Sequence, residues 1–183
     1  MEEINIEKKK ISFEIQEPSV ELKDSFLSAL KEYHQEGRNL DQDEKEIENN
    51  FSTFVQHFKD ESLGKNLKPE YVPQTTYWIA DKDGYAGRVS IRHELNENLL
   101  KIGGHIGYEV RPSKRGLGYG SKALELALSK ARSLGLEKVL LTCISTNIAS
   151  KKIIEANGGV LENEVHGEEG EPSRLRFWIK ISK

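Results

Sequence analysis

The stretch RPSKRGLGYGSKALELALSKA, residues 111–131, places three alternating glycines directly before a strongly helical run. They are Gly116, Gly118 and Gly120. Glycine costs about 1 kcal/mol relative to alanine inside a helix, so helix formation does not explain them. Another requirement must place the most flexible residues at the start of this helix.

The glycines lie in the turn of a predicted strand–helix–strand unit. HIGYEV (105–110) and KVLLTC (138–143) predict strands, and the helix between them runs from Tyr119 to about Leu134, with Gly135 as its C-terminal cap. The first N–H groups of a helix lack intrahelical acceptors, and the helix dipole adds partial positive charge there. Because glycine has no Cβ, an anion can approach these donors closely. The turn is therefore predicted to hold a phosphate group; the alternative is that the glycines serve tight turns alone.

Two amphipathic helices are predicted in the first third of the chain, behind a strand around residues 11–15. The first helix starts at Pro18 and Ser19. Asp41 and Glu44 match a capping box ahead of the second helix. This part of the chain is expected to pack against a sheet.

From residue 75 onward the pattern changes to strands. Two strands flank the sequence DKDG (81–84), whose Asp-Gly pair favours a tight hairpin turn. After the central unit, Asn147 is predicted to cap a short helix, and residues 160–165 and 174–180 predict two last strands. This order predicts a single α/β domain over residues 1–183 with a mixed sheet.

Composition limits the classes of function. The 183 residues carry a formal net charge of −3, so there is no overall basic field for a nucleic-acid backbone. No run reaches the roughly 18 apolar residues of a membrane span, and the charged start lacks the apolar core of a signal peptide. The single Cys143 cannot form an internal disulfide, which agrees with a reducing compartment. We expect a cytoplasmic protein with no nucleic-acid and no membrane partner.

The glycine turn matches neither common nucleotide motif. A P-loop ends in Gly-Lys-Ser or Gly-Lys-Thr, whereas this turn ends Gly120-Ser121-Lys122. A dinucleotide fingerprint needs a third glycine where Ser121 stands. The turn instead resembles the pyrophosphate motif of the GNAT superfamily of N-acetyltransferases, here written RGLGYG (115–120). The order of the elements and the stretch NIASKKIIEANGG (147–159) also resemble that superfamily, especially a group of uncharacterised bacterial acetyltransferases.

The resemblance implies a mixed, mostly antiparallel central sheet flanked by helices, with the strand–helix–strand unit binding acetyl-CoA as co-substrate and no metal. The main-chain N–H of Val110 would polarise the thioester carbonyl, and Asn147 and Ser150 would contact the pantetheine arm. The alternative for Asn147 is that it only caps a helix. The backbone N–H groups that would hold the pyrophosphate are those of Arg115, Gly116, Leu117, Gly118, Tyr119, Gly120 and Ser121.

The implied reaction moves an acetyl group from a thioester to an amine, and the amine must first lose a proton. His105 and Glu109 lie an even number of residues apart on one predicted strand, so they share a face. They are the two candidate general bases. The alternative is that both are ordinary strand residues with satisfied hydrogen bonds.

One position departs from the superfamily's pattern. Many members carry a tyrosine seven residues after the position of Asn147, where it protonates the leaving thiolate; here that residue is Ile154. Water, another residue such as Tyr108 or Tyr119, or no acid at all would then serve. Because a thiolate leaves readily, activity is still expected.

We therefore expect an acetyl-CoA-dependent N-acetyltransferase that acts on a primary amine of a small molecule or peptide, as a monomer or homodimer. Two other classes stay open at this point. One is an acyl-CoA-binding sensor or scaffold without turnover, which would bind the coenzyme and release no thiol. The other is a nucleotide-dependent enzyme, which would prefer ATP or NAD to coenzyme A.

Overall fold

The structure is a computed structural model that describes residues 12–167 and 170–181. Its strands are β1 (Glu14–Gln16), β2 (Gln74–Asp81), β3 (Gly84–Arg92), β4 (Ile106–Val110), β5 (Lys138–Ile144), β6 (Val160–Val165) and β7 (Arg174–Lys180). Its helices are α1 (Lys23–Gln35), α2 (Glu44–Asn49), α3 (Phe51–Ser62), α4 (Tyr119–Ser133) and α5 (Ile148–Ala156). Short helical turns are η1 (Val20–Leu22), η2 (Leu99–Gly103) and η3 (Pro112–Lys114). None of these described helices is long and apolar enough to cross a bilayer.

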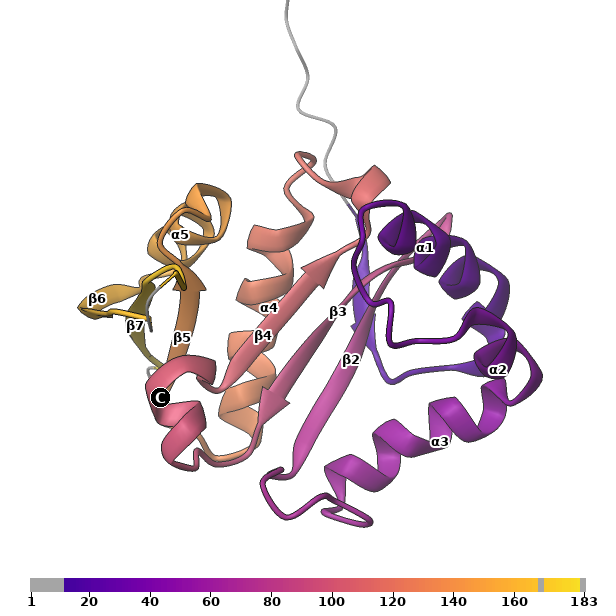
Figure 1. The fold of residues 1–183 in the computed structure, drawn as a ribbon, viewed down its shortest axis with the longest axis horizontal. Coiled ribbons are helices and arrows are strands. Elements are labelled where there is room, and N and C mark those ends of the chain that lie inside the picture. Colours follow the sequence, from indigo (N-terminus) through magenta and orange to yellow (C-terminus); the bar gives the residue numbers. More distant parts are fainter. Residues whose placement is uncertain (1–11, 168–169, 182–183) are drawn as a thin grey trace, which may run out of the picture.

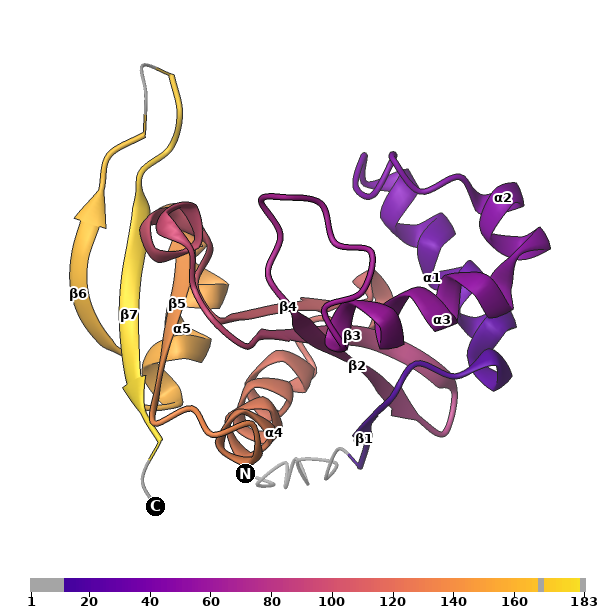
Figure 2. The same ribbon diagram turned by 90° about the horizontal axis from the view of Figure 1, so that it is seen from below.

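The strands form two sheets. One sheet has the order β1-β2-β3-β4 and the other β5-β7-β6, and the neighbouring strands within each are antiparallel. Helices α1 to α3 cover one face of the first sheet and α4 covers the other, while α5 packs against the second sheet (Figures 1 and 2). The prediction of an α/β fold with a mostly antiparallel sheet flanked by helices is confirmed.

Two apolar clusters hold these layers together, one on each face of the first sheet. Under α1 and α3, Trp78 is fully buried and stacks on Phe26 with ring centroids 5.0 Å apart. On the opposite face, Val89 and Ile91 of β3 pack in the cluster that contains Leu124 of α4. Neighbouring residues of a strand point to opposite faces, so β2 supplies both layers, with Trp78 in one cluster and Ile79 in the other.

The first helices differ from prediction at two points. Asp43, and not Asp41, caps α2, because its carboxylate accepts the N–H of Glu46 at 2.8 Å. The expected second helix is also divided into α2 and α3 at Asn50. Ser19 caps η1 directly before α1, as predicted. The first strand lies at β1; residue 11 of its predicted range falls outside the described residues.

The two strands of the central unit belong to different sheets. Among the described residues, β4 and β5 are linked by a bridge between Gly104 and Leu141 and by the N–H of His105, which donates to the Leu140 carbonyl at 2.7 Å. Beyond this joint the strands diverge, and a gap opens toward the end of β4 at Val110 (Figure 1). The predicted strand–helix–strand unit is present, and its two strands belong to separate sheets.

Candidate active site

The three glycines of the turn have two different tasks. Gly116 and Gly118 have φ angles of 73° and 89°, which residues other than glycine rarely adopt. Gly120 lies inside α4, where a Cβ would approach the Ile153 side chain of α5 to 2.8 Å. The first two glycines therefore shape the turn, and the third lets two helices approach each other.

The turn exposes a row of backbone donors. The N–H of Arg115, which was predicted among the donors, is not free because it donates to the Pro112 carbonyl at 3.2 Å. Within the described part of the chain, no N–H from Gly116 to Ser121 donates a well-formed hydrogen bond, and the first one of α4 to do so is Lys122, to Gly118. A Cβ on Gly116 would meet no atom within 4 Å, so there is room for a bound group. The donors and the positive end of the helix dipole fit a phosphate.

Side chains from the β2–β3 hairpin hold this turn in place. Lys114 reaches Asp81 at 2.8 Å and Asp83 at 2.7 Å, and the Tyr119 hydroxyl donates to Asp81. Hydrogen bonds from Lys114 and Lys82 lower the pKa of Asp83 to about 2. The side chains of Lys114 and Tyr119 are thus committed to the protein. The sequence indicated these aspartates only as part of a hairpin turn.

Arg115 links the same turn to α1. Its guanidinium contacts the Glu36 carboxylate at 2.8 and 2.9 Å, and its Nε donates to the Val110 carbonyl at 3.1 Å. Arg111 makes a parallel contact to Glu32, with Nε to Oε1 at 2.7 Å. The end of β4 and the glycine turn are therefore fixed relative to the helix that borders the opposite side of the site.

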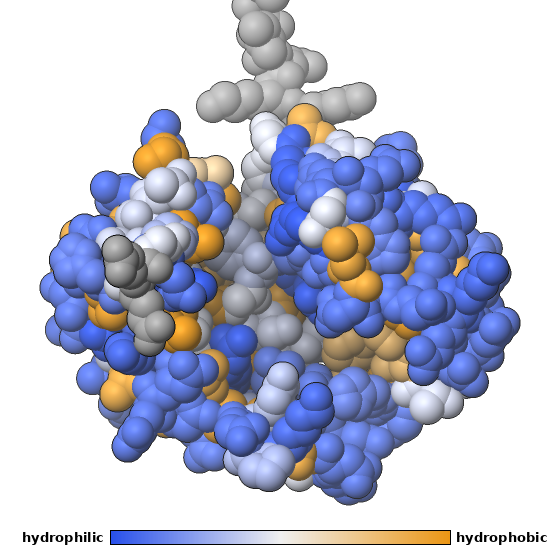
Figure 3. Space-filling model, in the orientation of Figure 1, coloured by the Kyte–Doolittle hydropathy of each residue, from blue (hydrophilic) through white to orange (hydrophobic). Residues whose placement is uncertain are grey.

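The gap between β4 and β5 is lined by free backbone of β4. Arg111 donates its N–H to Ala86 in β3 at 2.8 Å. Successive N–H groups of a strand point to opposite edges, so the N–H of Val110 points away from β3 and toward the gap. The space-filling view shows a hollow between the lobe with α5 and the lobe with α1 (Figure 3). The hollow gives this edge of β4 access to a ligand.

Helix α5 forms the far wall of the gap. The side chain of Asn147 accepts the N–H of Ser150 at 3.0 Å, so Asn147 caps the helix as predicted. Ile154, which stands where the superfamily's tyrosine is expected, is 1% exposed in the core. The Ser121 hydroxyl accepts a hydrogen bond from Asn157 at 3.3 Å, which connects the first turn of α4 to the C-terminal end of α5.

The two predicted bases lie at opposite ends of β4. His105 precedes the strand at the closed end of the gap, and its Nδ1 accepts the N–H of Leu140 at 2.9 Å. An acceptor Nδ1 places the proton on Nε2, so His105 has no free lone pair to take a proton from an amine. Burial lowers the pKa of His105 to about 4, and the charges of Arg92 and Lys138 act in the same direction. This geometry supports a structural role for His105 as the joint between the sheets.

The buried neutral His105 predicts a pH dependence of stability. Its pKa in the folded protein, about 4, lies below the ordinary value of 6.5, so the unfolded chain takes up a proton that the folded protein excludes. The stabilisation is complete above pH 6.5 and is lost as the pH falls toward 4. We expect a loss of about 2 kcal/mol after solvent screening.

Urea denaturation at pH 7 and near pH 4.5 measures this loss, with His105→Asn as the control. The Asn Oδ1 can still accept the Leu140 N–H but does not titrate in this range. The variant should therefore lose about 2 kcal/mol less on acidification than the wild type. Equal losses of unfolding free energy in both proteins would show that protonation of His105 does not cause the pH dependence.

Glu109 lies on the face of β4 toward α1. Its side chain is 10% exposed, and its two oxygens contact Arg38 at 2.7 Å and Arg88 at 3.3 Å. Asn39 donates a further bond at 3.3 Å. These contacts fix the position of the carboxylate at the residue next to Val110 in β4.

A small pocket opens beside Glu109, between α1, the segment after it, β3 and β4. Within the described residues, the buried Tyr33 hydroxyl in this pocket has no hydrogen-bond partner. Burial raises the pKa of Tyr33, so the hydroxyl keeps its proton at neutral pH. The pocket is lined by Phe26, Leu30, Tyr33, Asn39, Gln42, Tyr85, Arg88 and Glu109.

Solved structures share this fold at low sequence identity. An acetyltransferase from Salmonella typhimurium that modifies the N-terminal serine of a 50S ribosomal subunit protein has a TM-score of 0.65 at 18% identity, covering 93% of this chain and 96% of that one. A spermidine N-acetyltransferase chimera from Vibrio cholerae and hSSAT has a TM-score of 0.64 at 15% identity, covering 93% and 96%. A microcin self-immunity acetyltransferase in complex with acetyl-CoA and AMP has a TM-score of 0.67 at 15% identity, covering 92% of each chain.

The family is shown by a match at the level of sequence. Comparison with curated proteins finds no match of significant similarity. The family model described as an acetyltransferase (GNAT) domain matches residues 26–160, which include the glycine turn, both strands beside the gap and α5. This chain belongs to the GNAT family of acetyltransferases.

Proposed function

We propose that this acetyltransferase moves the acetyl group of acetyl-CoA to a primary amine, by direct attack of the amine on the thioester. The observation that carries the proposal is the glycine turn, with its unpaired N–H groups, at the open end of the β4–β5 gap. The turn would bind the coenzyme's pyrophosphate, and the pantetheine arm would enter the gap past Asn147 and Ser150. The Val110 N–H would stabilise negative charge on the carbonyl oxygen.

The acceptor is proposed to be an amine of a small molecule or a peptide. Proteins with the same fold include one named for spermidine and one that modifies an N-terminal serine, so the fold accommodates both kinds of amine. We propose that residues 1–183 work as one acetyltransferase domain, as a monomer or homodimer. The hollow between the α1 and α5 lobes is the proposed entry for the amine (Figure 3).

Glu109 is proposed as the group that accepts the amine's proton, directly or through water. It lies beside the residue whose N–H faces the gap, and Arg38 and Arg88 hold its carboxylate in position. We do not propose His105 as the base, because its Nδ1 already accepts the N–H of Leu140. A positioned carboxylate can contribute about 100-fold to such a step.

Glu109→Gln is therefore expected to lower kcat roughly 100-fold while the affinity for acetyl-CoA stays within about threefold. The substitution keeps the shape of the side chain and removes its ability to accept a proton. Arg38→Gln, which removes one ion pair and leaves the carboxylate, should cost less than tenfold. Rates measured from pH 6 to 9 test the role: a variant as fast as the wild type over this range would exclude Glu109 as the base.

Calorimetric titration with acetyl-CoA, coenzyme A, ATP and NAD tests the proposed function first, followed by thiol release in the presence of spermidine and of a peptide with a free N-terminal serine. Micromolar binding of acetyl-CoA with amine-dependent thiol release would support an N-acetyltransferase. Binding of acetyl-CoA without thiol release for every amine would favour the sensor or scaffold. That alternative stays open because the buried Ile154 stands where many members of the superfamily carry the tyrosine acid. A preference for ATP or NAD would show that the glycine turn serves another ligand.

A further inference from the structure

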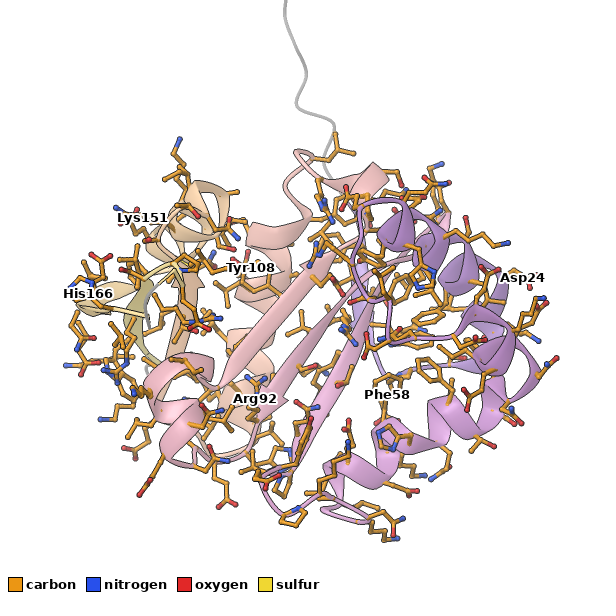
Figure 4. All side chains as sticks on the ribbon, viewed as in Figure 1. Asp24, Phe58, Arg92, Tyr108, Lys151 and His166 are labelled. Atoms are coloured by element: carbon orange, nitrogen blue, oxygen red, sulfur yellow. The ribbon has the colours of Figure 1, made fainter. Side chains whose placement is uncertain are left out.

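Tyr108 lies on the β4 edge of the gap and points toward α5 (Figure 4). Adjacent strand residues face opposite ways, so its side chain leaves β4 on the face opposite Glu109. Its ring lies near the start of α4, since a Cβ on Gly120 would be 3.7 Å from it. The side chain therefore lies beside the first turn of α4.

The Tyr108 hydroxyl is buried without a protein partner. It makes no well-formed hydrogen bond among the described residues. Its polar neighbours are the Ser150 hydroxyl in the first turn of α5 and the Cys143 thiol of β5, so it faces the α5 and β5 side of the gap. Buried hydroxyl groups in folded proteins are normally hydrogen-bonded, and one left unpaired needs an explanation, of which a catalytic role is one.

Other candidate acids are less suitable. Ile154 carries no proton to give. The Tyr119 hydroxyl already donates to Asp81, and its ring stacks on Phe13 at a centroid distance of 4.9 Å, away from the gap. Of the two tyrosines that the sequence suggested, Tyr108 is the one whose hydroxyl is free.

We infer that Tyr108 is the general acid of the reaction and protonates the sulfur of the departing coenzyme. This inference rests on the proposed acetyltransferase function. Tyr108 would then perform, from strand β4, the step for which α5 has only an isoleucine. Burial raises the pKa of Tyr108, which keeps its hydroxyl protonated at neutral pH.

The step balances without any further reactant. The amine nitrogen forms a bond to the acetyl carbon, and the bond between that carbon and sulfur breaks with its electron pair leaving on sulfur. Tyr108 gives its proton to the sulfur to form the thiol. The proton lost by the amine nitrogen returns to the Tyr108 oxygen through Glu109 and solvent, so the enzyme ends in its starting state.

The test compares two acyl donors in Tyr108→Phe: acetyl-CoA and its analogue in which oxygen replaces the thioester sulfur. A thiolate leaves readily, whereas an alkoxide requires a proton as it departs. We expect the variant to lose about tenfold in kcat with acetyl-CoA and about 100-fold or more with the oxygen ester. The affinity for acetyl-CoA, measured by calorimetry, should change by less than about threefold, which also shows that the variant is folded.

Tyr77→Phe is the matched control. Tyr77 lies on β2, away from the gap, and its ring faces Lys130 of α4, so losing its hydroxyl should affect both donors equally and little. An equal loss for both donors in Tyr108→Phe, or none, would overturn the inference while leaving the proposed function intact. A wild-type protein that binds acetyl-CoA and acetylates no amine would overturn both.

Discussion

Gly116→Asp is expected to weaken acetyl-CoA binding about 1,000-fold. The backbone at Gly116 has a φ of 73°, and a Cβ there would project into open space in front of the unpaired N–H groups of the turn. A carboxylate at this point would face the pyrophosphate. Two unit charges about 4 Å apart repel each other by about 4 kcal/mol at an effective dielectric of about 20. This repulsion corresponds to about three powers of ten in Kd.

Gly116→Asn separates charge from shape. Asparagine has nearly the same size as aspartate and tolerates a positive φ about equally well, so both variants should share any backbone strain. We expect Gly116→Asn to bind acetyl-CoA within about tenfold of the wild type. Calorimetric titration of both variants gives the comparison. If they bind equally, either well or poorly, the anionic group does not lie at Gly116 and the assigned coenzyme position is wrong.

Gly104→Ala is expected to destabilise the protein by about 3 kcal/mol or more. Gly104 has a φ of 74°, and a Cβ would approach the Leu140 carbonyl oxygen to 2.5 Å. Because that oxygen belongs to the backbone, β5 would have to move. The movement would also break the 2.7 Å bond from His105 N–H to the Leu140 carbonyl. A joint between the two sheets would be lost.

Thermal unfolding measures this effect: for a domain of this size the expected loss lowers Tm by roughly 6–12 °C. Gly107→Ala, three residues further along and inside β4, is the control, since a Cβ there meets no atom within 4 Å and its φ is not positive. That variant should melt within about 3 °C of the wild type. A Gly104→Ala protein as stable as the control would show that the joint contributes little to holding the sheets together.

Local signals in the sequence predicted most element boundaries. The hairpin at Asp83-Gly84, the cap at Asn147 and the end of α4 at Gly135 appear in the structure as expected, since each depends on residues within one turn. The start of α2 was wrong because the sequence DQDEKE contains two Asp-x-x-Glu matches, at residues 41–44 and 43–46. Local chemistry does not distinguish them; the burial of Ile47 by the rest of the fold does.

The site was predictable where it consists of backbone and less so where it depends on side chains. The glycine turn follows from sequence because unpaired donors and positive φ angles are local properties. The roles of His105 and Glu109 do not follow, since spacing gives only the face of a strand. Leu140, whose N–H donates to the Nδ1 of His105, is 35 residues away in the chain. The pair of arginines at Glu109 also comes from two separate elements.

The sequence by itself determined the order of the helices and strands, the glycine turn and the resemblance to the GNAT superfamily, because each is encoded in short-range patterns. Only the tertiary structure decided that β4 and β5 separate beyond Gly104, that His105 joins the two sheets and that the Tyr108 hydroxyl is free in the gap. A strand has the same alternating pattern whether its edge is paired or open. Which edges pair depends on contacts between residues far apart in the chain, and those contacts form only when the layers pack together.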